Sequence, residues 1–290
     1  MKPFRSQFVP IRGLRYHVRT WGDPDHRRLL LLHGWMDVSA SFQFVVDALA
    51  HDWYVIAPDW RGFGLSDWAP DGYWFPDYFA DLDALLDVFS PGAAASIVGH
   101  SMGGNVAGIY AGVRPGRVAR LVLAEGFGLK PTQPSQAPDR FDRWLKEQGR
   151  GEGFRAYATL ADVAARLRKT NPRLTQDKAR FLAPHWSMTL ADGTLAPAAD
   201  PRHRDVNPVL YRQEEAIACW RRITAPTLWL WGGDPEWMQQ FAGDDAEDWV
   251  RRRAAFARLT ECRIPGAGHM MHHDDPVSFA REIEAFLLAP

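Results

Sequence analysis

Short apolar runs alternate with amphipathic segments through the first half of the chain. Residues 14–20, 28–32 and 53–57 are patterned as strands, and residues 28–32 form a nearly continuous apolar run, as expected of a buried strand. Residues 41–50 and 78–89 carry apolar side chains at helical spacing. Strands that alternate with helices in this way predict the α/β class, with a mostly parallel central sheet covered by helices on both faces.

The alternation stops between residues 128 and 222. This segment opens with the proline-rich stretch 130–138, which suits neither helix nor strand. It continues with helical patterns rich in arginine and alanine, such as 140–148 and 161–169. We interpret residues 128–222 as an inserted, mainly helical cap.

The sheet pattern resumes after the predicted cap. Residues 227–231 and 258–264 are patterned as strands, and residues 276–288 as a closing helix. The core would therefore be built from two parts of the chain, residues 1–127 and 223–290.

The composition narrows the class of protein. The chain has 290 residues, of which 46% are hydrophobic, and its net charge of −1 offers no field that would attract nucleic acid. Its two cysteines, Cys219 and Cys262, make neither a disulfide framework nor a metal-binding cluster. No apolar run is long enough to span a bilayer. We expect a cytoplasmic protein with no membrane span, no nucleic-acid partner, no metal and no cofactor; the pattern leaves its oligomeric state open.

The most informative motif is Gly-His-Ser-Met-Gly-Gly at residues 99–104. It follows the apolar run 95–98 directly and precedes helix-forming residues, which is the strand–turn–helix setting of a nucleophile elbow. Gly99 and Gly103 stand at the two positions where a side chain would collide with the tight turn. Such a turn presents the hydroxyl group of Ser101 to a cleft, and we predict Ser101 as a catalytic nucleophile.

A serine hydroxyl group needs a neighbouring base to accept its proton. Among ten histidines, His269 lies in a glycine-containing loop between the last predicted strand and the last helix, so that the chain order is serine, acid, histidine. His272 and His273 fall where the final helix approaches, and we expect them to contact the scaffold or the cap. His269 is therefore the predicted general base.

Two carboxylates are candidates for the acid that orients His269. Asp234 follows the first strand after the predicted cap, which is the usual location of this group, and Glu125 stands at the tip of an earlier strand. Glu236 is a minor third candidate, because the spacing in its loop is irregular. On position along the chain we favour Asp234 and keep Glu125 as the alternative.

Acyl transfer also requires hydrogen-bond donors where the carbonyl oxygen becomes negative. The backbone amide of Met102, directly after the predicted nucleophile, opens a helix and is one candidate donor. The amide of Trp35 is the other, because it follows Gly34 after a buried strand, where the backbone can turn inward. We expect the neighbouring His33 to be structural. These amides form the predicted oxyanion hole.

With these motifs in order, the chain resembles the α/β-hydrolase superfamily over nearly its whole length. The matching elements are His-Gly-Trp at 33–35, Asp-Trp-Arg-Gly-Phe-Gly-Leu-Ser at 59–66, the nucleophile turn at 99–104 and Gly-His at 268–269. The longer string His-Gly-Trp-Met-Asp at 33–37 is similar to that of the serine hydrolase-like proteins. The resemblance gives residues 59–66 a role in bracing the loops beside the site.

The resemblance implies an esterase-like or lipase-like hydrolase. Such an enzyme cleaves a carboxylic ester, or a related acyl bond, of a small apolar substrate through a Ser-His-acid triad and an acyl-enzyme. The dehalogenases and epoxide hydrolases of this fold are excluded, since they use an aspartate where this chain has Ser101. Two alternatives remain, cofactor-free lyase or peroxidase chemistry and a non-catalytic ligand-binding module. The binding module is disfavoured because serine, histidine and at least one acid are all present.

Overall fold

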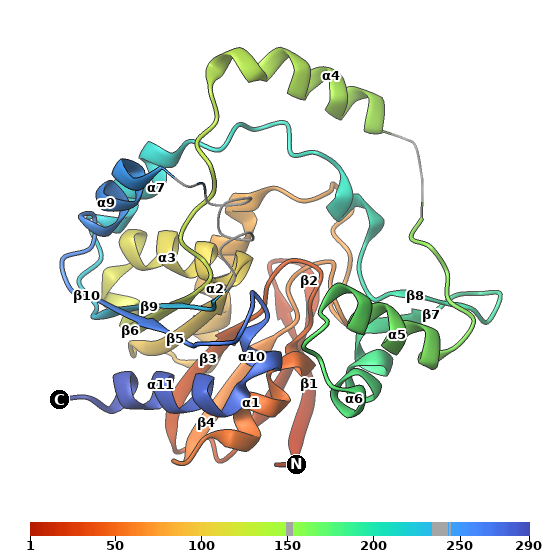
Figure 1. Cartoon of the computed structure of the whole chain (residues 1–290), viewed down its shortest axis with the longest axis horizontal. Coiled ribbons are helices and arrows are strands. Elements are labelled where there is room, and N and C mark those ends of the chain that lie inside the picture. Colours follow the sequence, from red (N-terminus) through yellow and green to blue (C-terminus); the bar gives the residue numbers. More distant parts are fainter. Residues whose placement is uncertain (149–152, 234–242, 244) are drawn as a thin grey trace.

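The computed structural model describes residues 1–148, 153–233, 243 and 245–290 (Figure 1). Their strands form one eight-stranded sheet, in the order β1-β2-β4-β3-β5-β6-β9-β10, and a two-stranded sheet, β7-β8. β1 pairs antiparallel with β2, and β2 antiparallel with β4. The remaining strands of this sheet, β4, β3, β5, β6, β9 and β10, run parallel. The mostly parallel α/β sheet that the apolar pattern predicts is confirmed.

Most elements of the large sheet and its helices agree with the sequence pattern; the strand at residues 4–11 and the helices at 246–253 and 271–274 were not predicted. The strands are β1 (Phe4–Ile11), β2 (Leu14–Trp21), β3 (Arg27–Leu32), β4 (Trp53–Pro58), β5 (Ala95–His100), β6 (Val118–Ala124), β9 (Thr227–Trp231) and β10 (Leu259–Arg263). The helices beside them are α1 (Gln43–Ala48), α2 (Phe75–Phe89), α3 (Met102–Val113), α7 (Gln213–Trp220), α9 (Ala246–Arg253), α10 (Met271–Asp274) and α11 (Pro276–Leu288). Across the described residues, every helix is too short or too polar to cross a bilayer.

The centre of the sheet is buried on both faces, and each face has its own helices. Along β3, Leu30 and Leu32 pack in a cluster that also contains residues of α2, α3 and α7. Leu29 and Leu31 point to the opposite face and pack with residues of α1 and α11. All four leucines are 0% exposed, which explains why this strand is a continuous apolar run and not an alternating one.

The segment predicted as a cap is helical with a small hairpin. It contains α4 (Ala137–Glu147), α5 (Leu160–Thr170), α6 (Gln176–Trp186), β7 (Ser187–Thr189) and β8 (Leu195–Pro197), and it ends with α7. α5 and α6 bury a cluster of their own that includes Val163 and Leu182. α7 packs against α3 and places Trp220 in the main core. The division of the chain into core and cap domains stays a prediction.

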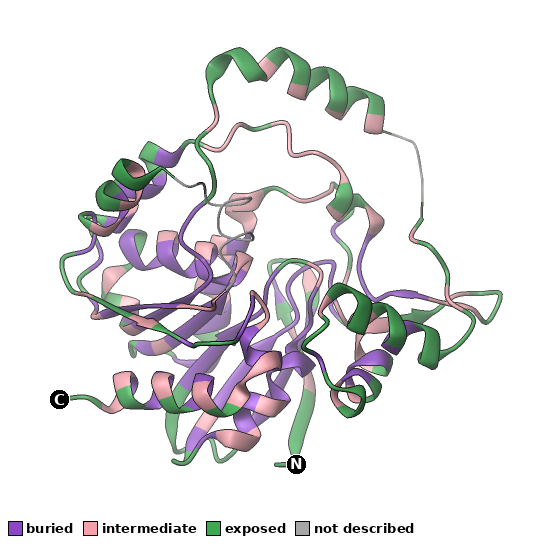
Figure 2. Ribbon diagram, viewed as in Figure 1, coloured by how far each residue is buried: buried purple, intermediate pink, exposed green. Residues whose placement is uncertain are grey.

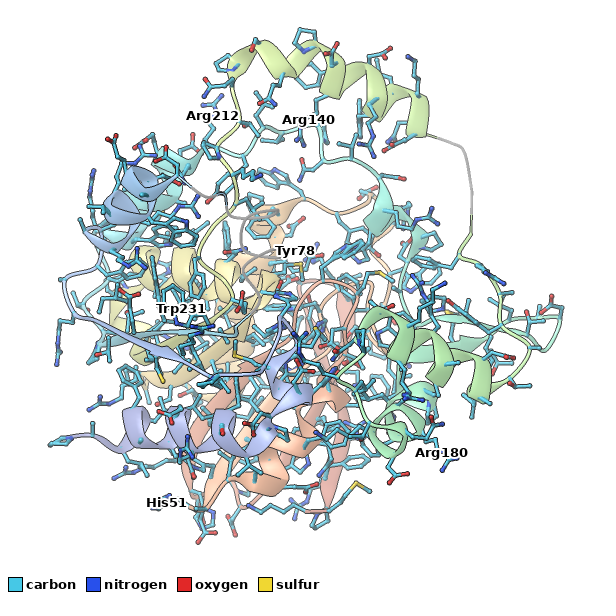
Figure 3. All side chains as sticks on the ribbon, in the orientation of Figure 1. His51, Tyr78, Arg140, Arg180, Arg212 and Trp231 are labelled. Carbon is cyan, nitrogen blue, oxygen red and sulfur yellow. The ribbon has the colours of Figure 1, made fainter. Side chains whose placement is uncertain are left out.

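Helix α4 arches away from the sheet, and none of its residues is buried (Figures 1 and 2). Polar contacts join α4 to the segment that precedes α7. Arg140 Nη1 donates to the carbonyl oxygen of Asn207 at 2.8 Å (Figure 3), and Glu147 accepts from the backbone amide of Val206 at 2.6 Å. Its neighbourhood is the most exposed part of the predicted cap.

The chain leading into α4 is expected to be the first site of proteolysis. Residues 131–138 contain three prolines and are mostly exposed. The stretch is not free of helix as the sequence pattern predicts, because Pro134–Gln136 form a 3-10 turn and α4 begins at Ala137, but a single exposed turn before the helix leaves the backbone accessible to a protease. Limited digestion of the native protein with a protease of broad specificity, followed by mass spectrometry, should place the first cuts in or beside this stretch. First cuts confined to residues 1–127 or 223–290 would contradict the interpretation of 128–222 as a cap.

Candidate active site

The described residues of the predicted site lie at one edge of the sheet. Ser101 and Glu125 follow the ends of β5 and β6, His269 lies in the loop after β10, and Trp35 lies in the loop after β3. These four strands are parallel, so their carboxyl ends meet at the same edge although the residues are far apart in sequence. This edge is the candidate active site.

Ser101 stands on a sharp turn between β5 and α3. Its backbone angles, φ 52° and ψ −116°, lie in a region that residues with a side chain rarely adopt. The turn is held by hydrogen bonds from the Ser101 amide to Ala124 O at 2.8 Å and from the Asn105 amide to Ser101 O at 3.0 Å. Strain of about 1–3 kcal/mol at one residue persists where the surroundings enforce it, and such residues gather at functional sites.

The glycines around this turn are required by space. A Cβ atom on Gly99 would lie 2.4 Å from the carbonyl oxygen of Gly103, and one on Gly103 would lie 2.2 Å from that of Leu32. A Cβ atom on Gly34 would lie 3.1 Å from the Cβ atom of Ser101. The nucleophile turn therefore packs directly against the end of β3 and the loop that follows it.

The predicted oxyanion donors belong to the two segments that meet in this contact. Met102 is the first residue of α3, and Trp35 follows the closely packed Gly34. The side chain of Trp35 is 53% exposed, and its indole N–H donates to the carbonyl oxygen of His203, in the predicted cap, at 3.2 Å. The assignment of both amides to an oxyanion hole stays a prediction.

Residues 59–66 brace the loops beside the site. The carboxylate of Asp59 accepts from the backbone amides of Ser39 at 2.6 Å and Leu65 at 3.0 Å. The imidazole of His33 is 0% exposed and accepts from the Trp60 amide at 2.9 Å. These contacts fit the structural roles expected for His33 and for the 59–66 motif.

His269 lies in the loop between β10 and α10, with its Nδ1 atom 3.8 Å from Oε2 of Glu125. Its side chain is only 18% exposed. Burial lowers the pKa of His269 below its ordinary value, while the carboxylate of Glu125 acts in the opposite direction. The imidazole is therefore neutral at neutral pH, which is the state that a general base requires.

Glu125 is a second strained residue at this edge, with φ 55°. Its amide donates to Leu230 O at 3.0 Å and its Oε1 atom accepts from the Gly232 amide at 2.6 Å, so both groups are tied to β9 and the turn after it. In the described part of the chain no donor hydrogen-bonds to Oε2, the oxygen that faces His269. The separation of 3.8 Å is an ion-pair distance, longer than a direct hydrogen bond.

Asp234, the acid favoured by position along the chain, lies outside the described residues, as does Glu236. Glu125 is therefore the candidate acid whose contact with His269 is described. His272 and His273 contact the scaffold and the cap: His272 Nε2 lies 3.3 Å from Asp37, and the carbonyl of His273 accepts from Lys178 at 2.5 Å.

The cap contacts the loop of His269 through Asp274. This carboxylate accepts from the backbone amide of Gly268 at 2.8 Å and from the side-chain amide of Asn171 at 2.7 Å. Asn171 directly follows α5, so Asp274 links the segment predicted as a cap to the loop of His269. Sequence reasoning missed Asp274 and Asn171, because no motif marks a contact between residues so far apart in the chain.

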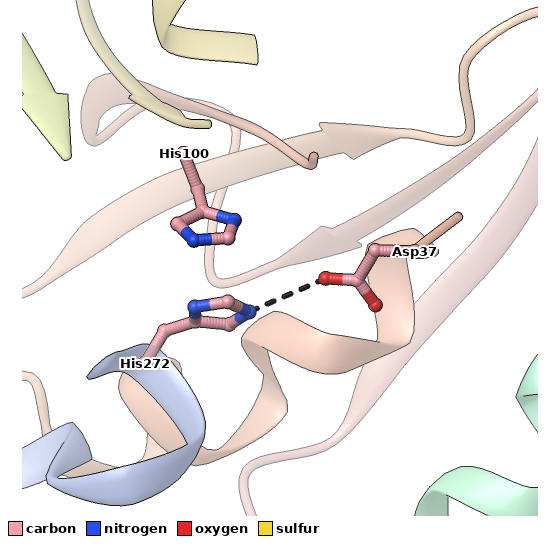
Figure 4. Close-up of side chains that lie close together, drawn as sticks. All are labelled: Asp37, His100 and His272. Carbon is pink, nitrogen blue, oxygen red and sulfur yellow. Dashed lines mark hydrogen bonds and ion pairs between the residues drawn. The ribbon is translucent and has the colours of Figure 1, made fainter. Parts of the chain in front are cut away.

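A buried group of Asp37, His100 and His272 lies behind the nucleophile turn (Figure 4). Among the described residues, these three offer atoms within 4.8 Å of one another that could ligate a metal. Both oxygens of Asp37 and both Nε2 atoms are engaged, since Asp37 accepts from the hydroxyl of Ser41 and contacts His272, and His100 Nε2 lies 2.8 Å from the carbonyl oxygen of His269. Among the described residues, the Nδ1 atoms of the two histidines have no hydrogen-bond partner. We assign the group a hydrogen-bonding role.

The sequence model of the alpha/beta hydrolase fold matches residues 27–276, which is most of the chain. The protein therefore belongs to the α/β-hydrolase family. A serine hydrolase-like protein of Danio rerio is 28% identical over 99% of this chain and 90% of the relative. A 2-(acetamidomethylene)succinate hydrolase of Mesorhizobium japonicum is 26% identical over 98% of this chain and 95% of the relative.

Solved structures show the same fold. A thioesterase domain from the curacin biosynthetic pathway has a TM-score of 0.86 and 23% identity, and the match covers 98% of this chain and 99% of that domain. The resemblance to the α/β-hydrolase superfamily and to serine hydrolase-like proteins, seen in the sequence motifs, is confirmed.

Proposed function

We propose that this protein is a serine hydrolase that cleaves a carboxylic ester, or a related acyl bond, of a small apolar substrate. The observation that carries the proposal is the strained turn of Ser101, at the same sheet edge as a partly buried, neutral His269 with a carboxylate 3.8 Å from its Nδ1 atom. The hydrolase names of the relatives support the same class of reaction.

The reaction has two halves. His269 accepts the hydroxyl proton of Ser101 as the serine Oγ atom attacks the acyl carbon, and the amides of Trp35 and Met102 stabilise the oxyanion. The imidazolium then gives this proton to the leaving alkoxide, and the alcohol departs from an acyl-enzyme. Water next gives a proton to His269 and attacks the acyl carbon. The bond between the acyl carbon and Oγ then breaks, and His269 returns the proton to Oγ, which releases the acid and restores Ser101.

We propose Glu125 as the acid of the triad, with Asp234 as the alternative. Position along the chain favours Asp234, whereas the described contact with His269 favours Glu125. A carboxylate at Nδ1 keeps the imidazole in the tautomer that leaves Nε2 free to accept a proton, and it stabilises the imidazolium that forms. The strained backbone of Glu125, held by two hydrogen bonds, supports this role.

The apolar nature of the substrate is inferred from the surface beside the predicted oxyanion donors. Trp35 is half exposed there and is linked by its indole to the cap. A panel of aryl esters of graded acyl length, followed by lactones, thioesters and amides, tests the substrate class. We expect turnover of apolar esters; turnover of none of these acyl compounds would contradict the proposed function.

Turnover is expected to fall in acid, with an apparent pKa below the ordinary histidine value of about 6.5. Burial lowers the pKa of His269, and protonation removes the acceptor for the serine proton, so activity is lost as the pH falls through that value. The measurement is kcat/KM between pH 4 and 9 on an ester whose turnover is limited by chemistry. A profile that stays flat to pH 4 would exclude His269 as the base.

A further inference from the structure

We propose that His100 is a positioning residue for the general base, which it holds in register with the nucleophile. The inference rests on the proposed function. It is carried by the contact of 2.8 Å between Nε2 of His100 and the backbone carbonyl oxygen of His269. Because His100 directly precedes Ser101, this hydrogen bond joins the nucleophile turn to the loop of the base.

The chemistry of the contact fixes the proton on His100. A carbonyl oxygen only accepts, so Nε2 is the donor. Burial, together with the nearby rings of His272 and His269, lowers the pKa of His100 well below its ordinary value, so the ring is neutral and Nδ1 carries no proton. A Cβ atom on Gly34 would lie 3.0 Å from Nδ1, which places this nitrogen against the loop after β3. The single ring N–H group of His100 therefore donates its hydrogen bond to the loop of His269.

The ring of His100 is enclosed by two other imidazoles. Its centroid lies 4.7 Å from that of His269 and 4.4 Å from that of His272. His272 is in turn fixed by Asp37, from the loop after β3, at 3.3 Å; Figure 4 shows this pair below His100. His100 and His272 are 1% and 0% exposed. A donor enclosed in this way is held in one orientation. In metal sites, groups that hydrogen-bond to a ligating histidine fix its orientation in a similar way.

Loss of this donor should act on the chemical step more than on substrate binding. The carbonyl of His269 would lose its buried partner, and the loop would shift to satisfy it. A misplacement of about 1 Å at a reacting group costs on the order of 100-fold in rate. The hydrogen bond that is lost ends on the loop of His269, so the base is the group whose position it controls.

Two amide variants of His100 separate the effect of its hydrogen bond from the effect of its burial. In His100→Gln the amide nitrogen can take the place of Nε2 and donate to His269, whereas in His100→Asn the shorter side chain cannot reach. We expect kcat of His100→Asn to fall about 100-fold with KM little changed, and His100→Gln to keep most of its kcat. The matched control is His273→Asn, because His273 is 4% exposed and its ring lies 4.2 Å from that of His272. It should lose stability and keep kcat.

A second readout does not depend on turnover. An NMR titration of His269 reports its environment, which includes Glu125, His272 and Asp37 as well as His100. In His100→Asn the imidazole of His269 should be more hydrated, so the pKa of His269 should rise toward about 6.5. An unchanged titration, or losses of kcat that are equal in the two amide variants, would overturn the inference. Failure of the proposed function can be told apart from failure of this inference. The proposed function fails if Ser101→Ala keeps full turnover, whereas the NMR titration tests His100 without any measurement of turnover.

Discussion

Ser101→Ala is expected to fold like the wild-type protein and to lower ester turnover by about 10⁵–10⁶-fold. Without the serine Oγ atom no acyl-enzyme forms, and the remaining rate comes from substrate binding and the oxyanion donors alone. The fold should be retained because alanine keeps the Cβ atom and the turn is held by backbone hydrogen bonds to Ala124 and from Asn105. The measurement is kcat/KM on the best ester of the panel, with thermal unfolding as the check on folding.

The matched control for this variant is Ser66→Ala. The hydroxyl of Ser66 donates to the carbonyl of Asp59 at 2.6 Å and accepts from the amide of His17 at 2.9 Å, inside the bracing motif. Its loss should cost about 1–3 kcal/mol of stability and leave turnover near the wild-type value. Near wild-type turnover in Ser101→Ala, with the expected behaviour of Ser66→Ala, would show that Ser101 is not the nucleophile.

Glu125→Gln is expected to lower turnover by about 10⁴-fold without unfolding the protein. The amide can still accept from Gly232, but it carries no negative charge to stabilise the imidazolium of His269. Asp234→Asn, the matched charge-to-amide change at the alternative position, is expected to keep most of the activity. Both variants should be compared with the wild-type protein on the same ester and over the same pH range.

Two other outcomes of this comparison would change the account. An inactive Asp234→Asn beside an active Glu125→Gln would return the acid to the position that the order along the chain favours, and would leave Ser101 and His269 unaffected. Full activity in both variants would contradict a triad built on either carboxylate.

Most of the core could be predicted from local patterns, whereas three strands show the limits of that reasoning. The apolar run of β3 and the helical spacing of α2 are strong because each segment is buried in a way that its own sequence records. β1 was not predicted: it contains Pro10, is largely exposed, and pairs with β2 at the edge of the sheet. β7 and β8 have three residues each, too few to show a period.

The sequence predicts which residues of the candidate site follow the strands, but not the distances between their side chains. Sequence order places both Glu125 and Asp234 after strands, and it carries no information on which carboxylate faces His269. The positive φ of Glu125 has no signal in the sequence either, because this conformation is enforced by packing. His100 and Asp37 stand inside the motifs at 99–104 and 33–37, yet their contacts arise only when three loops meet.

The most direct test of the central claim is covalent labelling of the native protein with a fluorophosphonate, followed by peptide mapping by mass spectrometry. Such a reagent modifies a serine that a neighbouring base activates. We predict one adduct, on Ser101, which forms more slowly in acid and is absent from both Ser101→Ala and the denatured wild-type protein. A folded protein that hydrolyses esters and yields no adduct at Ser101, or loses its turnover through an adduct on another residue, would contradict the account.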